Sequence, residues 1–207
     1  PPILDFERAS FIEPLACAIR AVDRMHTKPK SALVLGAGPM GLLMIQLLRL
    51  RGTETVLASE GSPMRAERAR RLGAALVWDP MTQDVPAATR KETGGLGVDA
   101  AVVATGNVRA IAQAVRAVRS GGTVLLLGVP EAGARLDVDP SEFVTREVSL
   151  VPSNAATEAE TRKALGLIAR KKIDVASLVT HRFPLESFPD AIRVAERAEC
   201  VKAILTP

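Results

Sequence analysis

Three glycines near the start of the chain have the spacing of a phosphate-binding turn. Gly36, Gly38 and Gly41 read as GxGxxG, and they lie between an apolar run that ends at Leu35 and a longer apolar stretch. The first glycine permits a tight turn, the second lets the backbone approach a phosphate, and the third lets a helix pack closely on a strand. The following helix would present free N–H groups and the positive end of its dipole. These residues indicate a site for the pyrophosphate of a dinucleotide.

A carboxylate follows the next apolar run. Glu60 comes directly after residues 55–59. An acid at the end of the second strand can accept hydrogen bonds from both ribose hydroxyls of adenosine, and its charge repels a 2′-phosphate. Glu60 therefore favours NAD over NADP, although Arg65 and Arg68 lie close enough in sequence to weaken that preference. The alternative interpretation is a tight turn in some other α/β protein.

The elements that must position these residues alternate between apolar runs and helical patterns. Continuous apolar runs indicate strands buried on both faces, and alternation with helices indicates a parallel sheet with right-handed crossovers. The sequence predicts an α/β fold, a doubly wound parallel sheet of about six strands (Rossmann fold), with its ligand at the carboxyl ends of the strands. The expected strands are residues 32–35, 55–59, 75–78, 98–104, 123–127 and 147–151, with a last strand at 202–205 and an extended piece at 181–184. The expected helices are residues 14–25, 42–51, 63–72 with Ser62 as the N-cap, 84–93, 108–118 with Asn107 as the N-cap, 158–172 and 188–198, and residues 1–12 are expected to be irregular.

Composition narrows the classes of protein. Aromatic residues make up 3% of the 207 residues and tyrosine is absent, so platforms for stacking nucleic-acid bases are lacking despite the net charge of +4. No apolar run reaches the length of a membrane span, and the N-terminus has no signal-peptide pattern. We therefore expect a cytoplasmic protein without nucleic-acid or membrane partners. Cys17 and Cys200 show no metal or redox spacing and are expected to be reduced thiols, one of them buried.

Seven sequence blocks share their order and spacing with a known family. They are EPLACAIRAV (13–22), VLGAGPMGLL (34–43), SPMRAERARRLGA (62–74), GVDAAVVATGN (97–107), SGGTVLLLGVP (120–130), THRFPLE (180–186) and VKAILTP (201–207). Through these blocks the chain resembles the medium-chain dehydrogenase/reductase family, the zinc-dependent alcohol and polyol dehydrogenases, over nearly its whole length. Members of that family carry an N-terminal catalytic barrel, which supplies most zinc ligands and precedes the block that begins here at Glu13.

The resemblance implies the cofactor-binding half of an NAD-dependent alcohol dehydrogenase-type oxidoreductase. That half positions nicotinamide for hydride transfer with a small alcohol or carbonyl substrate, and the full-length parent binds zinc. We expect the isolated chain, as a piece of a longer or divided protein, to bind cofactor with little turnover. Residues 1–30 would form a linking segment and helix from the catalytic side, 31–153 the NAD-binding domain, and 154–207 helices and a strand that pack back toward the catalytic domain.

The resemblance also assigns roles to individual residues. Gly36, Gly38, Pro39, Met40 and Gly41 would line the pyrophosphate, Glu60 would hold the adenosine ribose, and Arg65 would lie beside that ribose. Ala104, Thr105 and Gly106 would lie under the adenine-side ribose and the bridge, Gly128, Val129 and Val151 would serve the nicotinamide end, and Lys202 would reach the pyrophosphate. Glu13 would approach or ligate zinc, or else be a carboxylate stabilised by a helix dipole.

Other residues have structural interpretations. His26 and His181 lie outside any ligand pattern, so three or four zinc ligands cannot be assembled from the chain. His26 is expected at a solvated helix end, and His181 is expected to be structural. We interpret Asp137 and Asp139 as turn residues and Trp78 as packing.

Three other functions stay open at this point. They are a zinc-free NAD(P)H quinone or enone reductase of the same superfamily, a non-catalytic NAD-sensing module, and a methyltransferase that binds S-adenosylmethionine. The family resemblance also implies a homodimer formed through the strand at 147–151, where Pro152 would limit the pairing. Without the barrel, we expect exposed apolar surface near residues 11–25 and 180–207.

Overall fold

The computed structural model describes residues 4–25 and 28–207, so the expectation for His26 lies outside the described residues. A six-stranded parallel sheet with the order β3-β2-β1-β4-β5-β6 forms its centre. The strands are β1 (Ser31–Leu35), β2 (Thr55–Ser59), β3 (Leu76–Trp78), β4 (Val98–Val103), β5 (Val118–Leu126) and β6 (Ser149–Pro152). The strand order reverses between β1 and β4, which makes a switch point at their carboxyl ends. The predicted doubly wound sheet is confirmed.

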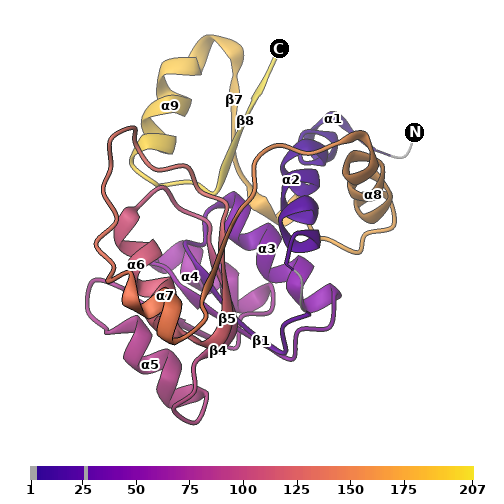
Figure 1. Ribbon diagram of the computed structural model, residues 1–207. Helices are drawn as coiled ribbons and strands as arrows, with labels where there is room; N and C mark the ends of the chain where they lie inside the picture. Colours follow the sequence, from indigo (N-terminus) through magenta and orange to yellow (C-terminus); the bar gives the residue numbers. More distant parts are fainter. Residues whose placement is uncertain (1–3, 26–27) are drawn as a thin grey trace.

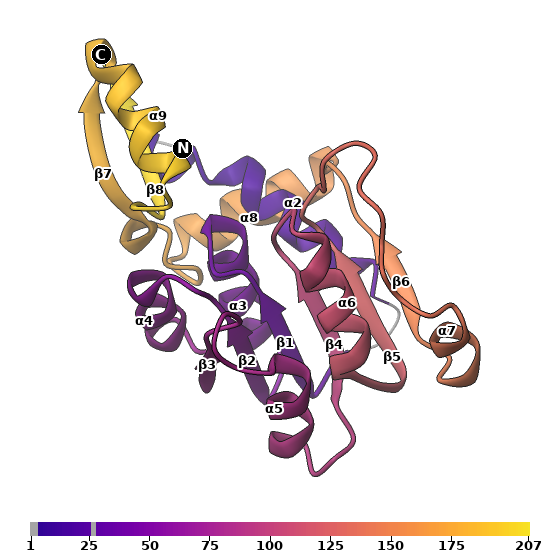
Figure 2. The same ribbon diagram turned by 90° about the vertical axis from the view of Figure 1, so that its left-hand side faces the viewer.

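Helices cover both faces of this sheet (Figure 2). In β1, Ala32 and Val34 join the core formed with α2 (Ile12–Asp23) and α3 (Pro39–Leu50). Leu33 and Leu35 join the opposite core, formed with α5 (Val85–Glu92) and α6 (Val108–Ala117). Helix α4 (Pro63–Arg71) packs on β2 and β3. Successive side chains of a strand point to opposite faces, so the continuous apolar run of β1 supplies both cores.

The helix that follows the glycine turn is largely buried. It begins at Pro39, whose fixed φ and missing N–H suit the first helical position. Six of its apolar side chains have no exposed surface and belong to the core shared with the sheet and α2: Leu42, Leu43, Met44, Ile45, Leu47 and Leu48. Burial of these side chains holds the N-terminus of the helix at the switch point.

Three local expectations are wrong, and one short helix was not predicted. Residues Phe6–Ala9 form a short helix, α1, because the Asp5 carboxylate accepts the Arg8 N–H at 2.7 Å. A second short helix, α7 (Ser141–Thr145), follows Asp139, whose carboxylate accepts the Ser141 N–H in the turn predicted for it. Strand β5 begins at Val118, at the end of the predicted helix, rather than at the predicted position 123. Ser62 precedes α4 but makes no side-chain capping bond.

The C-terminal part forms a separate small unit. Strands β7 (Val179–Pro184) and β8 (Lys202–Thr206) pair with each other, and with α9 (Phe188–Glu196) they stand apart from the main sheet (Figures 1 and 2). Along the chain, α8 (Glu158–Ala169) and the short 3-10 helix η1 (Ala176–Leu178) connect β6 to β7. A second 3-10 helix, η2 (Leu185–Ser187), precedes α9. Helix α8 packs beside α2 (Figure 1).

Of the two regions predicted to expose apolar surface, residues 11–25 and residues 180–207, only the second does so. Near residues 11–25 the expectation is wrong, because Phe11, Leu15 and Ile19 are buried in a core shared with α3 and α8. In the C-terminal unit, Leu185 and Phe188 are exposed, as expected.

Strand β6 lies at the open edge of the sheet. It starts at Ser149 rather than at the predicted position 147, since Glu147 has a φ of 52° that does not suit a strand. The homodimer through this edge stays a prediction. Among residues 4–25 and 28–207, no helix is both long enough and apolar enough to cross a bilayer.

Candidate cofactor site

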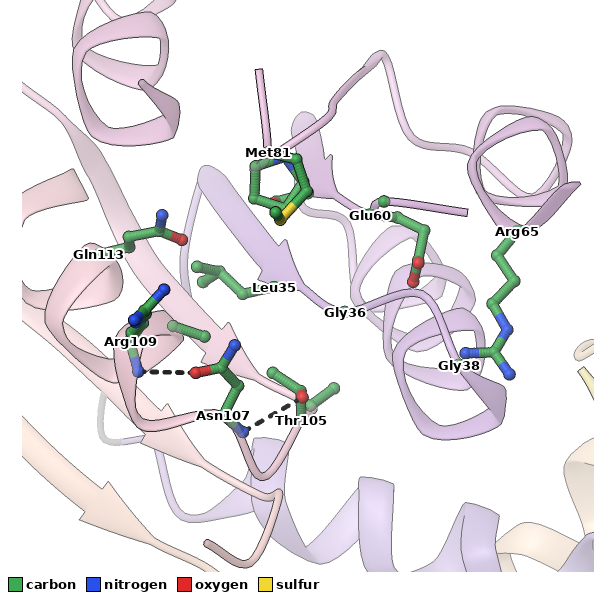
Figure 3. A pocket seen from close by; sticks show the side chains of 15 residues that line it. Leu35, Gly36, Gly38, Glu60, Arg65, Met81, Thr105, Asn107, Arg109 and Gln113 are labelled. Atoms are coloured by element: carbon green, nitrogen blue, oxygen red, sulfur yellow. Dashed lines mark hydrogen bonds between the residues drawn. The ribbon is translucent and has the colours of Figure 1, made fainter. Parts of the chain in front are cut away.

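A hollow of about 360 Å³ lies at the switch point, around the end of β1 (Figure 3). It is formed by the ends of β1 and β2, the segments that follow β1, β2, β3 and β4, and residues of α4 and α6. Six of the predicted cofactor residues line it together: Gly36, Gly38, Glu60, Arg65, Ala104 and Thr105. The expected meeting of residues from distant parts of the sequence at one edge of the sheet is confirmed.

The glycine turn has the backbone geometry expected from its spacing. Gly36 has a φ of +91°, which L side chains rarely adopt, and a Cβ on Gly41 would lie 1.8 Å from the carbonyl oxygen of Gly36. The predicted conformational roles of these two glycines are confirmed. A Cβ on Gly38 would meet nothing within 4 Å. The space beside Gly38 is therefore open to an approaching group.

Glu60 joins the glycine turn to the end of β2. Its Oε2 accepts the Ala37 N–H at 2.7 Å, and its Oε1 accepts the Ser62 N–H at 2.9 Å. The second bond is made to the backbone of Ser62, the residue that precedes α4. A carboxylate has about four lone-pair sites, so Glu60 keeps acceptor capacity for hydroxyl groups while it holds the turn. Figure 3 shows its carboxylate directed toward the turn.

Two arginines of α4 connect this site to the C-terminal part of the chain. The Nε and Nη2 atoms of Arg65 donate to the Cys200 carbonyl oxygen at 3.1 and 2.6 Å. Arg68 donates through Nη1 to the Ser177 carbonyl oxygen at 2.5 Å. Arg65 thus lines the hollow while part of its donor capacity is engaged by a neutral carbonyl group.

A second hollow, also of about 360 Å³, lies at the other side of the α3 N-terminus. Its lining includes four further predicted residues: Glu13, Pro39, Met40 and Lys202. The Nζ atom of Lys202 lies 5.8 Å from the centroid of the Phe11 ring, within cation–π range. Ser153 also lines this hollow, and its buried hydroxyl has no hydrogen-bond partner among the described residues. Buried polar groups are nearly always satisfied, so this hydroxyl fits a polar group of a ligand.

Glu13 and Cys17 form a pair in the second hollow. The Cys17 thiol donates to Glu13 Oε1 at 3.1 Å. Burial, followed by this hydrogen bond and the charge of Glu13, raises the pKa of the Cys17 thiol to about 11. The thiol is therefore protonated at neutral pH, and both cysteines are free, with Cys200 buried as expected for one of them.

These residues do not form a zinc centre by themselves. Within the described part of the chain, no three His, Cys, Asp or Glu side chains gather closely enough to hold a metal ion. His181 contacts the Thr180 hydroxyl at 3.0 Å and stacks on Phe183, which agrees with its expected structural role. Ligation of zinc by Glu13 stays a prediction that needs ligands from outside these residues.

Four other predicted residues line neither hollow: Gly106, Gly128, Val129 and Val151. A Cβ on Gly128 would lie 2.2 Å from the Thr105 carbonyl oxygen, and one on Gly106 would lie 2.6 Å from the Val129 carbonyl oxygen. These glycines therefore let the segments after β4 and β5 pack against each other. Val151 is half-buried in β6.

Sequence reasoning missed several residues of the first hollow. Pro80 and Met81 line it directly after β3, and Arg109 and Gln113 line it from α6. The position of Pro80 and Met81 after a strand was a usable signal, because ligands bind beyond the carboxyl ends of such strands. Asn107 caps α6 as predicted, because its Oδ1 accepts the Arg109 N–H at 3.0 Å, and it also lines the hollow.

The sheet order and the glycine turn at its switch point define the class of Rossmann-type α/β proteins. Comparison with known proteins gives the family. Residues 39–170 match the family described as zinc-binding dehydrogenase. Because this match covers more than half of the chain, the chain belongs to the zinc-binding dehydrogenase family.

Individual relatives agree with this membership. D-arabinitol dehydrogenase 1 of Uromyces fabae is 32% identical over 97% of this chain and 58% of its own length. L-galactonate-5-dehydrogenase of Escherichia coli strain K12 is 32% identical over 98% of this chain and 60% of its own length. The chain therefore spans about 60% of the length of these curated relatives.

Solved structures show the same fold. A putative zinc-binding dehydrogenase from Sinorhizobium meliloti 1021, bound to NADP, has a TM-score of 0.93 and 31% identity, and the match covers 100% of this chain and 61% of that one. An alcohol dehydrogenase from Thermus sp. ATN1 has a TM-score of 0.92 and 29% identity, with coverage of 100% and 61%.

Proposed function

We propose that this chain is the NAD-binding half of a zinc-type alcohol or polyol dehydrogenase. The observation that carries the proposal is the position of Glu60. This carboxylate lies at the switch point, bonded to the glycine turn, on the wall of a hollow large enough for part of a nucleotide. Its charge favours ribose hydroxyls and disfavours a 2′-phosphate. The names of the relatives support alcohols and polyols as the substrate class.

The two hollows divide the proposed cofactor between them. The adenosine would occupy the first hollow, with Glu60 accepting from its ribose and Arg65, Ala104 and Thr105 beside it. The pyrophosphate would cross the glycine turn and the α3 N-terminus, where Gly38, Pro39 and Met40 lie. The nicotinamide would enter the second hollow, toward Ser153 and Lys202. Gly106, Gly128, Val129 and Val151 would shape that passage.

The bound nicotinamide would supply hydride acceptor and donor chemistry, and this chain would orient it and exclude water from one side. No zinc centre is assembled by the described residues, so we assign this chain no step that needs zinc. We propose that the isolated chain binds cofactor with little turnover and that Glu13 approaches the zinc of the complete enzyme. The same proposal includes the division of the chain into a linking segment (1–30), an NAD-binding domain (31–153) and a C-terminal part (154–207). It also includes a homodimer formed through β6.

A calorimetric titration with NAD and separately with NADP tests the proposal. We expect NAD to bind more tightly than NADP. In Glu60→Gln, which keeps the size of the side chain and removes its charge, NAD affinity should fall about tenfold and the preference for NAD should shrink, since hydrogen bonds to charged groups contribute about 1.5–3 kcal/mol.

Glu67→Gln is the matched control, because Glu67 is an exposed carboxylate on α4 that pairs only with Arg70 and Arg71 among the described residues. It should leave both affinities unchanged. Tighter binding of NADP than of NAD by the unaltered chain would contradict the proposed selectivity. The comparison of the two cofactors is needed because one similar structure is bound to NADP. Binding of neither cofactor would contradict the proposed function itself.

A further inference from the structure

A third hollow, of about 290 Å³, lies directly beside the adenosine hollow. It is lined by Val108, Arg109, Ala112, Gln113, Arg116, Arg135 and Asp137. Arg109, Gln113 and Arg116 come from the exposed face of α6, and Arg135 and Asp137 come from the segment between β5 and α7. Arg109 and Gln113 line the adenosine hollow as well, so they form a common wall.

The lining carries an excess of positive charge. Three arginines line the hollow together with one acidic residue, Asp137. Within the described part of the chain, none of the three guanidinium groups makes an ion pair or a side-chain hydrogen bond, whereas the structure gives ion pairs to other exposed arginines such as Arg162 and Arg193. Three like charges around one small hollow repel one another, and an anion between them would remove that repulsion.

The position of Arg109 adds a second argument. It is the second residue of α6, where the positive end of the helix dipole disfavours a cation, and α6 has no acidic residue in its first turn. Arg116, in the last turn, is placed favourably for the same dipole and needs no further explanation. Arg109 therefore lowers the stability of α6 unless a negative group lies close to it.

We propose that this hollow is a binding site for a compact multivalent phosphate anion. Guanidinium groups match the geometry of phosphate oxygens and donate paired hydrogen bonds to them. Arg109, Arg116 and Arg135 approach the hollow from two segments, so they can surround a small anion, while Gln113 adds a neutral donor. The size of the hollow suits a di- or triphosphate group better than an extended polymer. The site is separate from the glycine turn, because Arg116 and Arg135 do not line the adenosine hollow.

Calorimetric titration with inorganic pyrophosphate at low ionic strength tests this site. The probe can also bind at the glycine turn, so the test depends on Arg116→Gln/Arg135→Gln, a double variant that changes only the third hollow. We expect this variant to weaken one class of pyrophosphate binding by about tenfold or more. Its NAD affinity, measured without pyrophosphate, should equal that of the unaltered chain.

The matched control is Arg71→Gln/Arg162→Gln, which removes two exposed positive charges elsewhere. It should leave pyrophosphate binding nearly unchanged. If both double variants weaken binding equally, the effect is the overall charge and the site is refuted. Absence of pyrophosphate binding to the unaltered chain also refutes it. Neither result depends on whether NAD binds, so this proposal and the proposed function can fail separately.

Discussion

Gly38 and Gly41 lie three residues apart, yet an added methyl group should change the stability of the fold at Gly41 and not at Gly38. At Gly41, a Cβ would lie 1.8 Å from a backbone oxygen, so helix α3 and the turn must separate. At Gly38, the backbone is extended (φ −66°, ψ −173°) and a Cβ would meet nothing. We expect Gly41→Ala to lower the free energy of unfolding by about 3 kcal/mol or more, and Gly38→Ala to change it by less than about 0.5 kcal/mol.

The Gly38→Ala substitution should lower the affinity for NAD instead. If the pyrophosphate crosses the glycine turn, the methyl group of Gly38→Ala occupies its path, and NAD affinity should fall about tenfold without loss of stability. Urea unfolding and NAD titration of both variants measure the two effects. Unchanged NAD affinity in Gly38→Ala would place the pyrophosphate elsewhere.

The candidate site was predictable where a residue acts through its backbone or its charge. Gly36, Gly41 and Glu60 have roles that depend on a missing Cβ or on an acid at a strand end, and the spacing in the sequence reveals both. Arg65 was expected beside the ribose, but its bond to the Cys200 carbonyl group depends on the position of a distant segment. Arg109 and Gln113 reach the hollow only because α6 presents one face to it, which no local pattern encodes.

At the scale of elements, one carboxylate fixes the starts of β1 and β4. Asp99 accepts the N–H groups of Lys30 and Ser31 at 2.8 and 2.9 Å and pairs with Arg119 at 2.7 Å. Burial alone raises the pKa of Asp99, but the hydrogen bonds from Arg119, Ser31 and Lys30 outweigh it and hold this pKa below its usual value. Asp99 therefore stabilises the folded chain as long as it is ionised.

This contribution should depend on pH in one direction. Because the folded-state pKa lies below that of the unfolded chain, the stabilisation is complete above the unfolded value of about 4 and disappears as the pH falls through the folded value. We expect Asp99→Asn to lower the free energy of unfolding by about 1–2 kcal/mol at pH 7, a figure reduced for partial exposure. The difference between Asp99→Asn and the unaltered chain should narrow below about pH 4.

Urea unfolding from pH 3 to pH 8 measures this dependence, with Glu131→Gln as the control. Glu131 is exposed, and among the described residues its side chain accepts no hydrogen bond, so its substitution should have little effect at any pH. A constant difference for Asp99→Asn across the whole range would show that its effect is packing rather than charge.

The elements themselves were predictable because the strands are buried on both faces. Such strands read as unbroken apolar runs, and β2 was placed at its observed bounds. The early start of β5 was missed because the Gly121–Gly122 pair, which usually marks a turn, lies inside the strand beside a register shift. The short helices α1 and α7 were missed because neither shows apolar periodicity, and each begins beside one aspartate whose carboxylate accepts a backbone N–H.

At the scale of the whole molecule, the C-terminal unit of β7, β8 and α9 joins the main body through Val179 in the larger core and through the Arg182–Glu7 ion pair. A pair of strands with one helix is marginally stable in water, and Ala191 is the buried residue of α9. The two hydrogen-bonded arginines of α4 hold the segments that lead into this unit, at Cys200 and Ser177. We therefore expect the amides of β7 and β8 to exchange through local opening, well before those of β1 and β4.

Hydrogen exchange of Arg65→Ala and Arg68→Ala tests this division of the molecule. Each substitution removes a charged donor from a backbone carbonyl group, so it should lower the opening free energy of the C-terminal unit by about 1–3 kcal/mol. The amides of β1 and β4 should exchange as before, and Arg71→Ala, which removes an exposed pair on the same helix, should alter neither region. Equal changes in both regions would mean that the chain unfolds as one cooperative unit. Adenosine binding could then act on the C-terminal strands only by stabilising the whole fold, rather than through Arg65.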